Sequence, residues 1–209
     1  MQTRKPVVAG QFYPGSRQSC VAEIEDCLAQ HPPGQDLPQT IVGGIVPHAG
    51  WTFSGALAAI VFSAVKQQHE KVDTFVIFGA AHSYFGDVPA VYQTGSWTTP
   101  LGDVVIDEDL AEAVLSTCTS QAVSDSGAHS SEHSIEVQVP FIQYLFPDAE
   151  ILPILVPPSE QAISLGEAVG GIISPAGKKI VCIGSTDLTH YGPRYGYTPM
   201  GTGAEALQW

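Results

Sequence analysis

The sequence predicts an α/β fold with a mostly parallel or mixed central sheet and helices on both faces. First, short apolar, β-branched runs alternate with amphipathic segments of helix length. Second, 209 residues with 44% hydrophobic content can bury one substantial core, so we expect a single domain over residues 1–209. Third, an apolar run that ends at glycine or proline and is followed by a histidine occurs three times, at residues 41–46, 74–78 and 179–183.

The first half of the chain predicts two helices flanking a buried strand. Residues 16–30 carry apolar side chains at helical spacing and end at a Pro-Pro-Gly turn. Residues 41–46 predict the strand, and Pro47 ends it because proline cannot donate to a sheet ladder. Ser54 is a suitable N-cap for an apolar helix over residues 56–65.

Strands and helices continue to alternate in the second half. Residues 88–93 and 103–106 predict strands separated by a turn-rich loop at 95–102, and residues 107–117 predict a helix with an acidic first turn. Residues 132–147 predict a helix that Pro140 kinks or divides. The remaining predicted elements are a strand at 150–156, a glycine-weakened helix at 159–173, and an exposed loop at 120–131, with irregular chain from residue 191 onward.

Composition excludes several classes of partner. A net charge of -13 argues against nucleic acid and anionic membranes. No apolar run is long enough to span a bilayer, and no signal peptide opens the chain.

The four cysteines show no CxxC spacing, which predicts reduced thiols in a cytoplasmic protein; they are Cys20, Cys27, Cys118 and Cys182.

The repeated strand–histidine pattern predicts a shared site. Ligands in open α/β sheets bind outside the carboxyl ends of the strands, so His48, His82 and His190 are expected to converge at one edge. His31 and His69 lie in polar connections and are expected at the surface, and His129 fits the same interpretation.

Two carboxylates accompany the histidines. Asp187 lies three residues before His190, where it either orients the imidazole or caps a helical turn. Glu132 stands at the start of a predicted helix, where the dipole favours a carboxylate in any case.

Imidazoles with an oxygen or sulfur donor suit Fe(II), Cu or Zn. The sequence has no HExxH, no GxSxG, no Walker A motif and no GxGxxG, which argues against zincin, hydrolase-elbow and nucleotide-binding chemistry. A zinc hydrolase receives little weight, because no clear nucleophile or general-base motif is present.

Five motifs in order resemble the Memo family, whose prokaryotic members are called protein B of the AmmeMemoRadiSam system. They are residues 9–14 (AGQFYP), 47–51 (PHAGW) with Ser54-Gly55, 79–82 (GAAH), 132–141 (EHSIEVQVPF) and 185–192 (STDLTHYG). The resemblance implies a fold related to the class III extradiol, LigB-type dioxygenases. It also implies a metal pocket at the strand ends.

The resemblance also implies roles for individual residues. His48 and His82 match the metal-binding histidines, and His190 matches an acid/base histidine beside the metal. His133 matches a further pocket histidine, and Phe12 stands where an aromatic side chain lines the mouth of the cleft. Family members typically supply a late cysteine as third ligand, and the dioxygenases a late glutamate. No residue before Trp209 matches either, so we expect this chain to lack the family's C-terminal portion.

Two functional hypotheses follow. In the first, His48 and His82 hold Fe(II) or Cu for redox chemistry, His190 oriented by Asp187 moves protons, and His133 contacts substrate. In the second, the cleft is a non-catalytic module that binds a peptide or protein. Its expected contacts are Phe12, Trp51 and Glu132, with Trp97 near the mouth. Apolar surface left without cover is also expected to favour a homo-oligomer.

Overall fold

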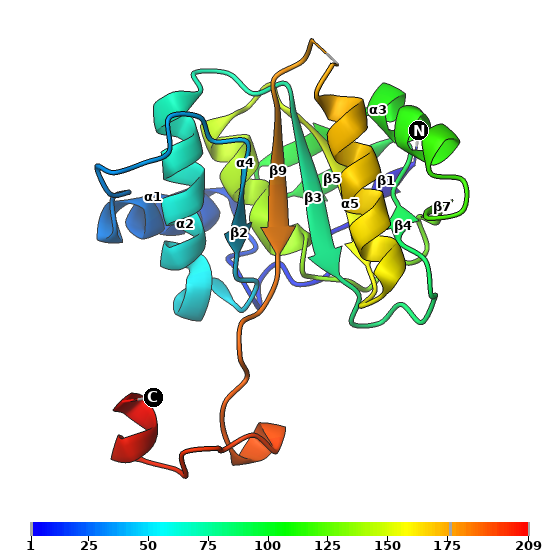
Figure 1. Cartoon of the computed structure of the whole chain (residues 1–209). Helices are drawn as coiled ribbons and strands as arrows, with labels where there is room; N and C mark the ends of the chain where they lie inside the picture. The colour runs from blue at the N-terminus through cyan, green and yellow to red at the C-terminus, as the bar shows by residue number, and fades with distance from the viewer. Residues whose placement is uncertain (1, 176, 209) are drawn as a thin grey trace.

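A computed structural model describes residues 2–175 and 177–208 and contains a six-stranded central sheet (Figure 1). The strand order is β2-β9-β3-β8-β4-β7. Every neighbouring pair is parallel except β4 and β8, so the predicted mostly parallel or mixed sheet is confirmed. The strands are β2 (Gly43–Val46), β3 (Thr74–Ala80), β4 (Ala90–Val91), β7 (Val123–Ser124), β8 (Glu150–Val156) and β9 (Ile180–Ser185).

A second, three-stranded sheet joins the N-terminus to the middle of the chain. Its strands are β1 (Thr3–Arg4), β5 (Ser96–Thr99) and β6 (Gly102–Val105), in the order β1-β5-β6. The prediction of a loop at residues 95–102 was therefore wrong. The segment pairs with β1 on one side and β6 on the other, and Trp97 is buried, so tertiary pairing overrides its polar, turn-rich composition.

Helices cover both faces of the central sheet, as predicted (Figure 1). Successive side chains of β3 face opposite sides: Phe75 and Ile77 belong to one apolar cluster, and Val76 to the other. The first cluster packs against α1 (Arg17–Gln30), α2 (Trp51–Gln68), and η1 (Glu136–Gln138) with α4 (Val139–Leu145). The second packs against α3 (Glu108–Thr117) and α5 (Glu160–Ile173).

Two helix starts differ from the prediction. Helix α2 begins at Trp51 with Gly50 as N-cap, and the Ser54 hydroxyl instead donates to the carbonyl of Ala49. The Trp51 amide donates to the Phe12 carbonyl at 2.7 Å, which anchors the earlier start. The helix predicted at 132–147 begins only at Glu136. It divides into η1 and α4 next to Pro140, as predicted, and this proline lies in the first turn of α4, where its missing N–H costs little.

The surface placement predicted for two histidines was also wrong. His69 is buried and its Nε2 lies 2.8 Å from the Ile41 carbonyl; His129 is fully buried, with Nε2 3.0 Å from the Ala90 carbonyl. Each imidazole satisfies a backbone group in the interior, which a polar local sequence does not reveal. His31 is exposed, as expected.

After β9 the chain leaves the body as an extended arm, residues 186–208 (Figure 1). The arm carries two short 3₁₀ helices, η2 (Pro193–Tyr195) and η3 (Ala204–Gln208), where irregular chain was predicted. All four cysteines are free thiols. Within the described ranges, no helix combines the length and hydropathy that a membrane span requires.

Candidate metal centre

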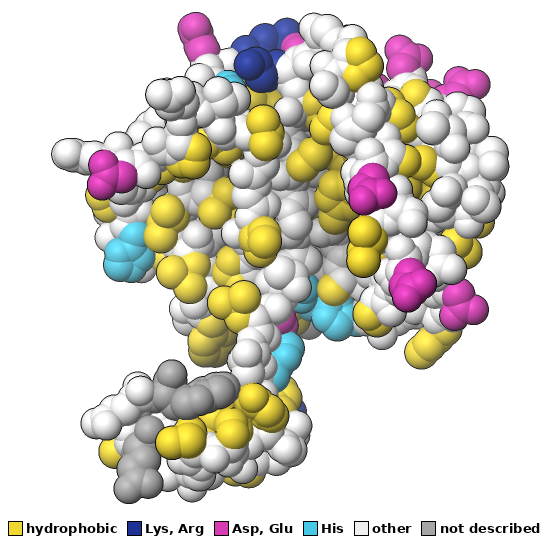
Figure 2. Space-filling view, in the orientation of Figure 1, with side chains coloured by type: hydrophobic (Ala, Val, Ile, Leu, Met, Phe, Trp, Pro, Cys, Tyr) yellow, Lys and Arg dark blue, Asp and Glu magenta, His cyan; other side chains and the backbone are white. Residues whose placement is uncertain are grey.

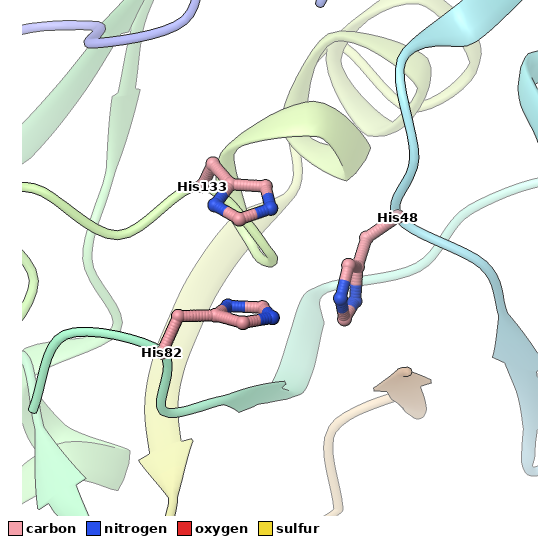
Figure 3. A group of neighbouring side chains, drawn as sticks. All are labelled: His48, His82 and His133. Atoms are coloured by element: carbon pink, nitrogen blue, oxygen red, sulfur yellow. The ribbon is translucent and has the colours of Figure 1, made fainter. Parts of the chain in front are cut away.

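Three imidazoles meet at the carboxyl end of the central sheet (Figure 3). They belong to His48 after β2, His82 after β3, and His133 shortly before η1. One ring nitrogen from each lies within 4.8 Å of those of the other two. The rings of His82 and His133 stack at a centroid distance of 4.6 Å, and His48 stands nearly perpendicular to both.

Strand order explains why His48 and His82 meet. Strands β2 and β3 flank β9 and run parallel to it, so all three end at one edge. In register, Val46 and Gly79 both align with Ser185 of β9. The histidines follow two and three residues later, so the convergence predicted for these two is confirmed.

Glu132 orients His82. Its buried carboxylate lies 2.9 Å from His82 Nδ1 through Oε1, and Oε2 accepts the His82 backbone N–H at 2.8 Å. With Nδ1–H donating to Glu132, Nε2 keeps its lone pair for a metal ion, as second-shell carboxylates of metal-binding histidines usually arrange. The carboxylate is enclosed and its oxygens are used within the protein, and the substrate contact expected for Glu132 stays a prediction.

The same carboxylate fixes the turn that carries His133. Oε1 accepts the backbone N–H groups of His133 and Ser134 at 2.8 and 2.9 Å. Burial alone raises the pKa of Glu132, but the hydrogen bonds from Ser134 and His82 outweigh it and lower the pKa to about 2. Glu132 is thus ionised at neutral pH. Its carboxylate fixes the ring of His82 and the backbone of His133.

His48 presents an unused nitrogen to the cluster. The side chain is buried, and Nε2 has no hydrogen-bond partner among the described residues. Asp187 Oδ1 lies 3.4 Å from that nitrogen, an ion-pair distance without hydrogen-bond geometry. Burial lowers the pKa of His48, and His82 and His133 reinforce the effect against the opposing charge of Asp187. A neutral imidazole with a free lone pair is the form that binds metal.

His133 completes the triangle and contacts the N-terminal segment. Burial lowers its pKa against the opposing charge of Glu132. The ring of Phe12 packs edge-on against it at a centroid distance of 4.9 Å, and Phe12 is partly exposed. Sequence reasoning assigned His133 to substrate, whereas the geometry makes it a candidate metal ligand beside His48 and His82.

These residues fit a bound transition metal. Burial lowers the pKa of His48 and of His133, which favours their neutral forms, and Glu132 orients His82 so that its Nε2 faces the cluster. One ring nitrogen of each of the three imidazoles is therefore within reach of a common ion. Three-histidine sets suit Fe(II), Cu or Zn, and the histidines alone do not choose among them.

His190 lies outside the triangle, so the predicted convergence of all three strand-end histidines was only partly right. It follows β9 by five residues, on the arm, and about half of its side chain is exposed. Asp187 links it to the centre: Oδ2 lies 2.9 Å from His190 Nε2, while Oδ1 faces His48 Nε2.

A buried ion pair braces the N-terminal segment against the site. Arg4 contacts Glu136 at 2.8 Å and also donates to the carbonyls of His129 and Glu132. Glu136 in turn accepts the amides of Val7 and Val8 and the Tyr13 hydroxyl, which holds the loop that carries Phe12. The sequence offered one signal for this role of Glu136, its place one turn after Glu132.

The tryptophans predicted near the cleft mouth lie in the interior. Trp51 is buried, packs against Phe141 at 4.5 Å and donates from its indole to the Val137 carbonyl. Trp97 is buried beneath the Arg4 guanidinium, 4.1 Å from the ring centroid. Both side chains therefore pack inside the protein, and the contacts with a peptide expected for them stay a prediction.

Comparisons with known proteins agree over nearly the whole chain. The family model "Memo-like protein" matches residues 4–207. A MEMO1 family protein of Thermococcus onnurineus is 39% identical over 213 residues, covering 98% of this chain and 71% of the relative. Relatives with the same description in Pyrobaculum aerophilum and Pyrococcus abyssi are 40% and 41% identical, covering 92% and 94% of this chain and 70% and 68% of theirs.

Proposed function

Since the chain belongs to the Memo-like protein family, we propose that it is a metal-dependent redox protein that holds iron or copper at His48, His82 and His133. The observation that carries the proposal is the triangle of imidazole nitrogens, with His48 Nε2 buried and unpaired among the described residues. A cytoplasmic location, where Fe(II) and free thiols persist, belongs to the same proposal.

Iron or copper held by these residues would supply one-electron redox chemistry and Lewis acidity. Glu132 fixes the tautomer and direction of His82, and its backbone contacts fix the position of His133. Phe12 shields one side of His133 from water.

His190 and Asp187 handle protons in this proposal. Because Asp187 engages His190 at Nε2, the second nitrogen, Nδ1, is available to exchange a proton with substrate or solvent. The half-exposed position on the arm gives that nitrogen access to water. Asp187 acts as the positioning residue of the pair, as the spacing of the two residues predicts.

Metal content by plasma mass spectrometry, on untagged protein reconstituted without oxygen, tests the proposal. We expect about one equivalent of iron or copper in the wild type and almost none in the double variant His48→Ala/His82→Ala. His133→Ala should weaken binding as well, whereas the exposed His31→Ala is the matched control and should bind normally. Retention of a full equivalent by the double variant would overturn the proposal.

A second candidate is a module that binds a peptide without catalysis, and Phe12 favours it. This aromatic side chain is partly exposed and packs at the edge of the histidine cluster, where it can contact an incoming side chain. Binding of tyrosine-containing peptides that persists after metal removal and is lost in Phe12→Ala would support this candidate. Binding that depends on the metal would count against it.

A further inference from the structure

A cavity of about 660 Å³ opens beside the metal centre, on the α5 side of the sheet. It lies where the carboxyl ends of β3, β8 and β9 meet the N-terminal half of α5. Figure 2 shows this face hollowed between β9 and α5, with hydrophobic side chains around it and histidine side chains at its lower margin, next to the arm. The volume falls within the roughly 300–1,000 Å³ that small-molecule pockets occupy.

Two walls of the cavity lead directly into the metal centre. Ala80 and Ala81 line it, and the next residue is His82. Ser185 and Thr186 line it from the neighbouring strand, and the next residue is Asp187. Ser185 Oγ also lies 3.5 Å from His48 Nδ1. The cavity therefore adjoins the metal centre through these strand ends, and none of the three imidazoles is among its lining residues.

The lining selects an uncharged, largely apolar occupant. None of the lining residues, all of them within the described part of the chain, carries a charge. Apolar surface comes from Phe78 and Val156 at the strand ends and from Ala162 on α5. An ionised ligand group placed here would lose its hydration without a partner of opposite charge.

The geometry points to this cavity as the site for the apolar body of the molecule on which the metal centre acts. The substrate class is an uncharged, mainly apolar small molecule with one polar group that extends past the strand ends to the imidazole triangle. This inference rests on the proposed function, because it assigns a substrate to the same metal centre.

Small residues keep the cavity open, which provides a direct test. A Cβ added at Gly166, a lining residue, meets no atom within 4 Å. Gly166 lies one turn after Ala162 on the lining face of α5, so a phenylalanine there is placed at the mouth of the cavity. Gly171 on the same helix also has open space around its Cβ but does not line the cavity, so Gly171→Phe is a matched control for the backbone effect.

The first measurement is a titration with Nile red, an uncharged apolar dye, followed by its fluorescence. We expect saturable one-to-one binding to the wild type, at least tenfold weaker binding to Gly166→Phe, and near wild-type binding to Gly171→Phe. Equal binding to all three proteins, or an equal loss in both variants, would overturn the inference.

The second measurement connects the cavity to the metal. Cu²⁺ quenches a fluorophore only at short range, whereas Zn²⁺ binds imidazoles without quenching. We expect Cu²⁺ to quench the fluorescence of the bound dye in the wild type and not in His48→Ala/His82→Ala. Zn²⁺ should leave the fluorescence unchanged in both proteins. Stoichiometric Cu²⁺ without quenching would refute the link between cavity and centre. A wild type that binds no metal would instead overturn the proposed function, and this inference with it; metal analysis alone identifies that outcome.

Discussion

Replacing Glu132 with glutamine should damage both the stability of the fold and the metal centre. The carboxylate receives four hydrogen bonds: the backbone N–H and Nδ1 of His82, and the backbone N–H groups of His133 and Ser134. Glutamine has the same shape, but its amide offers only one oxygen as an acceptor, and its nitrogen is a donor. The change therefore removes charge and acceptor capacity without changing volume.

The cost can be worked out from these contacts. If the amide oxygen takes the place of Oε1, the amide nitrogen faces the His82 backbone N–H, and one buried donor is left unsatisfied at about 1–3 kcal/mol. The three remaining bonds lose their charge assistance, which brings the total to roughly 3 kcal/mol or more. The pKa gives a similar value: a carboxyl lowered from 4.5 to about 2 in the folded state contributes roughly 3 kcal/mol at neutral pH.

Urea unfolding of metal-free protein at pH 7 measures the loss of stability, and calorimetric titration with Zn²⁺ measures the metal affinity. We expect Glu132→Gln to bind metal about 10- to 100-fold more weakly, as lost second-shell carboxylates generally cause. Glu136→Gln is the control, because it alters an equally buried carboxylate that contacts no imidazole. It should lose stability and keep its metal affinity. A Glu132 variant with wild-type affinity, or a stability loss below about 1 kcal/mol, would refute this account of the site.

Three further changes test the surrounding framework. Burial lowers the pKa of His129 from 6.5 to about 4, so folding stability is complete above pH 6.5 and falls by roughly 3 kcal/mol as the pH drops to 4. Urea unfolding between pH 7 and 4.5 should show a smaller fall in folding stability for His129→Gln than for the wild type. Equal falls in the two proteins would contradict this prediction. Gly79→Ala places a Cβ 2.3 Å from Ile135 Cγ1 and should cost about 1–3 kcal/mol, and a double variant with Ile135→Ala should cost less than the sum of both. Arg4→Met leaves Glu136 buried without its cation and should cost about 3–5 kcal/mol; recovery of part of this loss in Arg4→Met/Glu136→Gln checks the ion pair.

The sequence predicted those parts of the fold that depend on local pattern. The strand at residues 150–156 was predicted with the bounds that β8 has, and the strand-end positions of His48 and His82 followed from the general behaviour of parallel sheets. The prediction failed for residues 95–102, where β5 owes its strand conformation to partners far away in the chain. Local propensity contains no information about such pairing.

In the candidate site, too, local contacts could be predicted from the sequence and contacts between distant residues could not. His133 sits in a tight turn whose direction is set by hydrogen bonds to Glu132, so periodicity could not place its ring beside the other two. The role of Glu132 also required knowledge of where His82 lies, fifty residues earlier. For Asp187 and His190 the sequence left two alternatives, orientation of the imidazole or capping of a helical turn. The two side chains do contact each other, but residues 186–190 form no helical turn.

The N-terminal brace has a consequence for the order in which the molecule assembles. Strand β1 pairs with residues 96 and 97, and Arg4 docks against residues 129–136, so this segment gains these partners only after the chain up to residue 136 has been made. Such distant contacts close large loops and slow folding. We therefore expect the segment that carries Phe12 to dock late, after the central sheet has formed. Chain synthesis that stalls before η1 would leave this segment unprotected and open to chaperones and proteases.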